Sequence, residues 1–118
     1  MRRRREFLDV QRRGRRAPTA SFLLVHARSD GGAPARLGIT VTRRVGGAVT
    51  RNRIKRSVRE VFRRCRRDLP DGLDVVVIAR DRAAGLTPLA VAEELRPALL
   101  ALAASRSEAG RPKPADRP

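Results

Sequence analysis

Basic side chains and one amide are concentrated in the middle of the chain, where they could bind phosphate. Between Gly46 and Arg67 the only acid is Glu60, so this stretch lacks the mixed charges that support an ordinary exposed helix. Guanidinium and ammonium groups bind phosphate through charge-assisted hydrogen bonds, and closely spaced arginines repel one another unless anions lie between them. The candidate phosphate-binding residues are Arg51, Asn52, Arg53, Lys55, Arg56 and Arg59. This stretch therefore predicts a surface for a polyanion, with a merely solvated helix face as the alternative.

A catalytic centre made by the chain itself is not indicated. Protein nucleases normally use clustered carboxylates that hold metal ions, or histidine pairs for acid and base catalysis. The 12 acids are scattered, mainly in the C-terminal half, and His26 is the only histidine, so no catalytic residue and no metal ligand is assigned. Cys65 is the only cysteine, which excludes an internal disulfide. Taken alone, the residues predict a binding module.

A helix over residues 46–69 is needed to position the basic residues, and its apolar residues predict one. At 100° per residue, one arc of about 100° holds the side chains that must face a core. These are Ile54, Val58, Val61, Phe62, Cys65 and Leu69. The opposite ridge consists of Asn52, Arg56, Arg59, Arg63 and Arg66, with Arg53 and Lys55 on its flanks. Because the turn Val45-Gly46-Gly47 feeds directly into the helix, unpaired N–H groups and the positive end of the dipole favour an anion there.

The overall charge indicates the same class of partner. The net charge is +16, and the first 59 residues carry 17 of the 28 basic residues but only three of the acids. Such a balance is typical of proteins that bind nucleic acid. No run approaches the roughly 18 apolar residues of a membrane span, and the arginine-rich start leads into Glu6 and Asp9 rather than an apolar signal core. We therefore expect a cytoplasmic protein with no membrane partner and no small-molecule substrate.

Periodicity and turn residues predict one domain over residues 1–104 and a disordered tail over residues 105–118, which lack an apolar period. The predicted elements are a helix over residues 2–13, one or two strands over 15–27, a strand over 36–43, the basic helix over 46–69, a strand over 75–79 and a helix over 87–102. The last helix is expected to bury Leu89, Val91, Ala92, Leu95, Leu99 and Leu102. Its N-cap is expected to be Thr87, followed by Pro88 at the first helical position.

Strict alternation in residues 36–43 predicts a strand with two different faces. Its apolar face carries Leu37, Ile39 and Val41, whereas the other face carries Gly38, Thr40 and Thr42. Small and hydroxyl-bearing side chains leave room for an extended ligand. Arg43 and Arg44 follow at the end of the strand and add positive charge.

The order of these blocks resembles that of a known family. REF ending at Phe7, then RRGRR, LGITVTRRVGGAVTRNRIKR and LDVVVIAR together resemble the protein subunit of bacterial ribonuclease P, over residues 2 to about 102. The resemblance implies that catalysis belongs to an RNA subunit, which also binds most of the Mg²⁺, and that the protein alone binds no cofactor. It implies that this chain binds the catalytic RNA and the 5′ leader of precursor tRNA, and so assists the hydrolysis that leaves the mature tRNA 5′ end.

The resemblance also implies site residues. Contacts to the catalytic RNA fall on Arg51, Asn52, Arg53, Lys55, Arg56 and Arg59. Beside the resemblance, the residues themselves predict a groove for the leader between the first helix and the polar strand face, lined by Phe7, Phe22, Thr40, Thr42, Arg43 and Arg44, with the alternative that both phenylalanines pack in the core. The family often carries further aromatic residues where this chain has Gln11 and Val25, so stacking on bases is expected to be modest here.

The implied fold is α+β, a two-layer α/β sandwich in the order αββ(β)αβα. Its mixed sheet has a left-handed crossover through the Arg-Asn-Arg helix, against the usual right-handed rule, as in the second domain of a small-subunit ribosomal protein. Two other functions remain open on the residues alone. A ribosomal protein would share the charge and bind structured rRNA, and a DNA-binding helix would read bases in the major groove.

Overall fold

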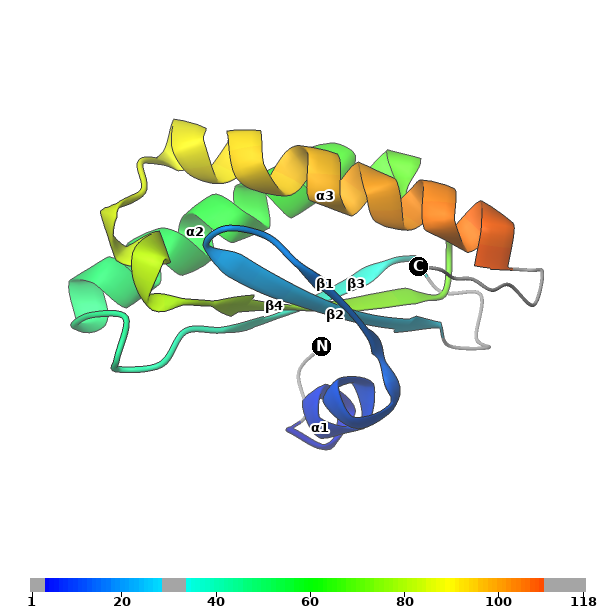
Figure 1. Ribbon diagram of the computed structural model, residues 1–118, viewed down its shortest axis with the longest axis horizontal. Coiled ribbons are helices and arrows are strands. Elements are labelled where there is room, and N and C mark those ends of the chain that lie inside the picture. Colours follow the sequence, from blue (N-terminus) through cyan, green and yellow to red (C-terminus); the bar gives the residue numbers. More distant parts are fainter. Residues whose placement is uncertain (1–3, 29–33, 110–118) are drawn as a thin grey trace.

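The computed structural model describes residues 4–28 and 34–109, and Figure 1 shows a central sheet with helices on both faces. The elements in chain order are α1 (Arg4–Arg13), β1 (Arg15–Pro18), β2 (Phe22–Arg28), β3 (Arg36–Thr40), α2 (Ala48–Cys65), the 3₁₀ helix η1 (Arg66–Asp68), β4 (Leu73–Ala79), the 3₁₀ helix η2 (Asp81–Gly85) and α3 (Pro88–Ala109). The predicted α+β class and element order are confirmed. The segment after α1 forms two strands, β1 and β2.

The sheet is mixed and has four strands in the order β1-β2-β4-β3. β2 runs antiparallel to both β1 and β4, whereas β3 runs parallel to β4. Parallel neighbours need a crossover connection, which α2 supplies between β3 and β4. The last strand in the chain, β4, is therefore a central strand of the sheet. Its side chains are buried on both faces except that of Ile78, which is partly exposed.

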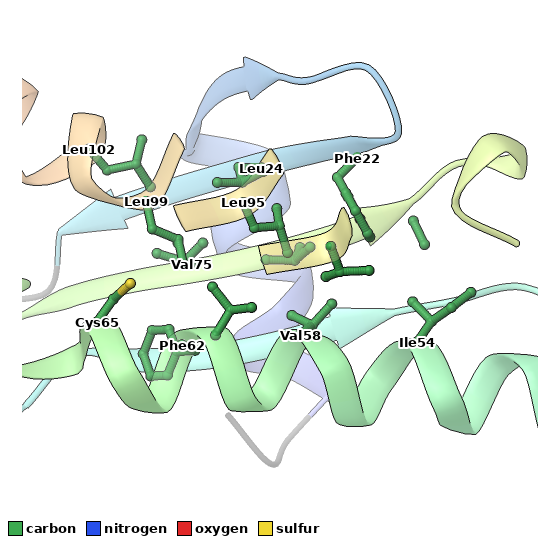
Figure 2. Packing of buried hydrophobic residues seen from close by; sticks show 14 of the residues in the cluster. Phe22, Leu24, Ile54, Val58, Phe62, Cys65, Val75, Leu95, Leu99 and Leu102 are labelled. Carbon is green, nitrogen blue, oxygen red and sulfur yellow. The ribbon is translucent and has the colours of Figure 1, made fainter. Parts of the chain in front are cut away.

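The main core lies between the sheet and the pair α2 and α3 (Figure 2). Alternate side chains of β2 and β4 point into it, among them Phe22, Leu24 and Val75, since successive residues of a strand face opposite sides. Leu95, Leu99 and Leu102 of α3 complete the layer. All six apolar side chains of the predicted arc are buried, five of them on α2 and the sixth, Leu69, just after η1.

The other face of the sheet is crossed by α1 (Figure 1). Val10 of this helix packs on Val25 and Val76 in a second, smaller cluster. The chain turns directly from α1 into β1 at Gly14, whose N–H donates to the Val10 carbonyl over 2.7 Å. A Cβ at Gly14 would lie 2.8 Å from the His26 carbonyl oxygen, so only glycine allows this close approach.

Several predicted boundaries and one predicted core residue are wrong. The basic helix, predicted over residues 46–69, spans Ala48–Cys65 and is followed by η1, and the strand predicted to begin at residue 75 begins at Leu73. β3 ends at Thr40, because the chain turns at Arg43–Val45 to enter α2. Helix α3 continues to Ala109, beyond the predicted start of the tail at residue 105, and residues 110–118 lie outside the described part of the chain. Leu89 is 68% exposed, since it points about 160° away from the buried Val91 around the helix axis.

Candidate nucleic-acid interface

The start of α2 is a positively polarised surface made by the backbone and by side chains together. Gly47 at the N-cap has an extended backbone and offers no side chain to the first-turn N–H groups, and the first turn contains no acid. Unpaired N–H groups at a helix start favour an anion. The preceding turn, held by the Val45 N–H donating to the Thr42 carbonyl over 3.1 Å, places Arg43 and Arg44 in the segment that leads into this helix start.

The six residues predicted to contact the catalytic RNA all lie on α2, and the structure divides them by exposure. Asn52, Arg56 and Arg59 are exposed on the ridge opposite the core, as the helical period requires. Arg53 is exposed on the flank nearer α3, whereas Arg51 and Lys55 are partly buried on the opposite flank. A single flat ligand cannot touch both flanks, since Arg53 and Lys55 point about 160° apart around the helix axis.

Arg53 already has a partner within the protein. Its terminal nitrogen donates to the Ala84 carbonyl in η2 over 2.8 Å. This hydrogen bond connects the first half of α2 to the loop that precedes α3. Arg53 is therefore held in place by the fold, and local sequence patterns could not predict this contact because the two residues are 31 positions apart.

Arg51 shows the opposite situation. Its Nε is shielded from solvent and has no hydrogen-bond partner among the described residues. A buried unpaired donor costs about 1 to 3 kcal/mol, and part of that cost is recovered when the side chain shifts to present this nitrogen to an acceptor on a ligand. Of the six predicted residues, Arg51 is the one whose surroundings call for an outside acceptor.

Further along α2, the ridge is partly neutralised. Glu60 accepts hydrogen bonds from Arg63, at 2.6 Å to its terminal nitrogen, and from Arg64, at 2.7 Å to its Nε. Hydrogen bonds from these two arginines lower the pKa of Glu60 from 4.5 to about 2, so the carboxylate is charged at neutral pH. The uncompensated charge is thereby concentrated in the N-terminal half of the helix.

The predicted leader-binding residues of β3 and the following turn lie together. Thr40 is partly exposed at the end of β3, and Thr42, Arg43 and Arg44 are exposed. The strand register adds two residues that sequence reasoning missed. Leu23 pairs with Ile78, which pairs with Thr40, so these three side chains form one row on the sheet face that carries α1. Leu23 and Ile78 are partly exposed and make this face more apolar than predicted.

Phe22 is not a leader contact, and that prediction is wrong. Its side chain is 0% exposed and packs in the main core, on the opposite face from α1 (Figure 2). Phe7 lies in α1, but its side chain is outside the described part of the structure, so its role stays a prediction. Val25, where the family often has an aromatic ring, is buried beneath Val10 and is not available to a ligand in this arrangement.

An ion pair lies on the sheet face that carries α1, at the other end of β3 from Thr40. Arg36 donates from Nε to Asp74 Oδ1 over 2.9 Å and from a terminal nitrogen to Oδ2 over 3.0 Å. Asp74 is only 2% exposed, and a buried carboxylate requires such pairing. This bidentate contact ties the edge strand β3 to β4.

Within residues 4–28 and 34–109, no three His, Cys, Asp or Glu side chains come together in a way that could hold a metal ion. In the same part of the chain, no helix is long and apolar enough to cross a bilayer.

Comparisons with known proteins identify the family. A family model described as Ribonuclease P matches residues 1–103. The ribonuclease P protein component of Gluconacetobacter diazotrophicus is 43% identical over 97 residues, which cover 81% of this chain and 84% of that protein. Among solved structures, the RNase P protein of Staphylococcus aureus matches with a TM-score of 0.79 at 29% identity, over 87% of this chain and 93% of the other.

A solved RNase P protein from Thermotoga maritima matches with a TM-score of 0.78 at 36% identity, over 85% of this chain and 96% of the other. The family model spans residues 1–103 and therefore includes the whole sheet, the basic helix α2 and most of α3. This chain therefore belongs to the family of bacterial ribonuclease P protein components.

Proposed function

We propose that the chain binds the catalytic RNA of ribonuclease P through the start of α2, binds the 5′ leader of precursor tRNA on the sheet face that carries α1, and thereby assists removal of the leader. Membership of the family implies partnership with ribonuclease P RNA. The observation that carries the assignment of the surface is the uncapped, acid-free start of α2 with exposed cations around it.

Contacts to the catalytic RNA are expected from Arg51, Asn52, Lys55, Arg56 and Arg59. Backbone N–H groups and guanidinium groups bind phosphate oxygens without reading sequence, which suits a surface that docks on a folded RNA. Arg53 contributes less in this proposal, because its guanidinium is bonded to Ala84 and would have to give up that contact or share it. The expected order of importance therefore places Arg56 and Arg51 ahead of Arg53.

The leader is proposed to run along the row of Leu23, Ile78 and Thr40 toward the turn at Arg43 and Arg44. Aliphatic side chains offer apolar contact to base faces without a sequence requirement, as a subunit that serves many precursors needs. The two arginines are exposed beside this row and can contact the leader phosphates. Phe7 stays a predicted contact from α1.

Catalysis is proposed to belong to the RNA. The carboxylates near the interface do not suit a metal site of the protein, since Glu60 is bonded to two arginines and Asp74 is paired with Arg36. Mg²⁺ would therefore be bound chiefly by RNA phosphates, where it supplies charge stabilisation for phosphodiester hydrolysis. The part of the protein is to position RNA and leader and to neutralise their charge.

The first test replaces Arg56, which is exposed and forms no hydrogen bond or ion pair among the described residues. Arg56→Ala should weaken binding of the catalytic RNA about tenfold or more in moderate salt, because a charged hydrogen bond contributes about 1.5 to 3 kcal/mol. Arg67→Ala is the matched control, since Arg67 is also exposed but lies in η1 beyond the end of α2. Equal affinities for wild type and Arg56→Ala would refute the assignment of the RNA surface.

The second test concerns the leader. The ratio of holoenzyme affinities for leader-bearing precursor and for mature tRNA should fall in Arg43→Ala/Arg44→Ala and in Phe7→Ala. Binding of the catalytic RNA itself serves as the control, because a variant that has lost its fold loses both. An unchanged ratio in all of these variants would place the leader elsewhere.

A further inference from the structure

A pocket of about 500 Å³ lies between α2 and α3, away from the start of α2 and away from the sheet face that carries α1. Its floor is formed by side chains that are buried or nearly so, namely Ser57, Val61 and Cys65 of α2 and Ala92 of α3. Its volume is within the range of pockets that hold small organic groups. Neither the docking of the catalytic RNA nor the leader path proposed above uses this pocket.

The rim of the pocket is basic. Arg64 and Arg96 line it and are both exposed. The single acid of the lining, Glu60, is already bonded to Arg63 and to the Nε of Arg64, which leaves the terminal nitrogens of Arg64 for an outside acceptor. Arg96 makes no ion pair with any residue in the described part of the chain. The rim therefore favours an anion.

The wall of the pocket is apolar and open. Leu89 is 68% exposed and stands beside Pro88 at the mouth, so an occupant would cover a leucine that otherwise faces water. The floor offers one hydroxyl, that of Ser57, and no buried charge. A flat ring with a polar edge and an attached anionic group matches this combination of apolar walls, one hydroxyl and a guanidinium rim.

We infer that the pocket accepts one unstacked base of a single-stranded RNA segment, with the adjoining phosphate bound by Arg64 and Arg96. This rests on the proposed function, in that the chain must bind RNA. The basic ridge of α2 supports RNA as the source, because Arg63 is the neighbour of Arg64 in sequence and shares Glu60 with it. Single-stranded RNA commonly binds proteins through splayed bases inserted between side chains.

Cys65 provides a local reporter, because it is the only cysteine of the chain and lies on the floor of the pocket. Burial raises the pKa of its thiol, although the charge of Arg96 acts in the opposite direction. Its reaction with an aromatic disulfide reagent should be slow and should depend on access through the pocket. An occupant of the pocket should slow the reaction further.

The experiment measures Cys65 modification in the full chain with a short oligoadenylate, with AMP and with hexanoate as probes. Saturating oligoadenylate should slow modification about tenfold, and hexanoate should not. Slowing by AMP as well would show that a free nucleotide suffices, whereas slowing by the oligonucleotide alone would show that the strand is needed. Equal protection by hexanoate would overturn the inference, because the pocket would then accept any apolar anion, including one presented by a protein partner.

Three variants test whether the protection of Cys65 comes from binding in the pocket. Arg96→Ala and Leu89→Asp replace exposed residues and should each weaken oligoadenylate protection of Cys65 about fivefold or more, while Ala101→Phe, an exposed position of the same helix, should not. Unchanged protection in both rim variants would overturn the inference. Failure of the proposed function is separately visible, because it would appear as unaltered binding of the catalytic RNA by Arg56→Ala, whatever the rim variants show.

Discussion

Arg51→Met should separate folding from RNA binding more clearly than any other change at the interface. Methionine keeps an unbranched side chain that can occupy the same partly buried space, but it has no donor. In the unbound protein the Nε of Arg51 is shielded and unpaired among the described residues, which costs about 1 to 3 kcal/mol for a fully buried group. Since Arg51 as a whole is partly exposed, we take the lower end of this range, about 1 kcal/mol, as the recoverable part.

The free energy of unfolding of Arg51→Met, measured by urea denaturation, should therefore be unchanged or higher by up to about 1 kcal/mol. Its affinity for the catalytic RNA at one fixed salt concentration should fall about tenfold or more, because the charged hydrogen bonds to phosphate are lost. Such opposite effects are typical of residues kept for function at some cost in stability.

Lys55→Met is the matched control. Lys55 lies one turn further along the same flank and is also partly buried, but no buried unpaired donor is found there in the described structure. Its loss should weaken RNA binding without raising stability. If Arg51→Met lowered the free energy of unfolding by more than about 1 kcal/mol and left RNA affinity unchanged, Arg51 would be a packing residue and the reasoning would be refuted.

Three further outcomes are expected. RNA affinity should fall with salt with a log–log slope steeper than about −3, because five phosphate contacts add roughly 0.7 to 0.9 each, and a nearly flat dependence would contradict phosphate binding. Phe22→Ala should lower the free energy of unfolding by about 3 to 5 kcal/mol without changing the preference for leader-bearing precursor at temperatures where the variant is folded. Burial opposes ionisation of Glu94, but hydrogen bonds from Thr19 and Ser21 outweigh this effect and lower the pKa of the carboxyl group from 4.5. The ionised Glu94 therefore stabilises the fold fully above pH 4.5, and this stabilisation is lost as the pH falls through the lowered pKa. Glu94→Gln should flatten the acid limb of the stability curve, and an unaltered acid limb would show that these hydrogen bonds do not matter.

The basic helix was predictable from the sequence in nearly every respect. A long amphipathic pattern repeats its information over several turns, so the buried arc from Ile54 to Leu69 and the exposed ridge followed from periodicity alone. The assignment of Phe22 failed for a physical reason. Strand β2 is apolar on both faces. Alternation shows which of its residues share a face, but not which of the two faces is covered by α2 and α3 and which by α1.

Contacts between distant segments were the other omission. Glu94 accepts hydrogen bonds from the Thr19 hydroxyl over 2.5 Å and from the Ser21 N–H over 2.6 Å, joining α3 to the turn between β1 and β2. Nothing local in the sequence indicates a partner for Glu94 that lies more than seventy residues away. The row of Leu23, Ile78 and Thr40 can be predicted only when the order of the strands in the sheet is known, and periodicity in a single sequence does not provide that order.

The position of β4 has a consequence for synthesis and folding. β2 reaches β3 only through β4, so a nascent chain that ends before Leu73 contains a β1–β2 hairpin and a β3–α2 unit with no strand to join them. That incomplete chain already carries most of the excess positive charge, which repels itself in the absence of anions. Folding must therefore wait until β4 and α3 have left the ribosome. Polyanions present at that moment, including the RNA that the finished surface is proposed to bind, would screen the repulsion and act as a folding aid as well as a ligand.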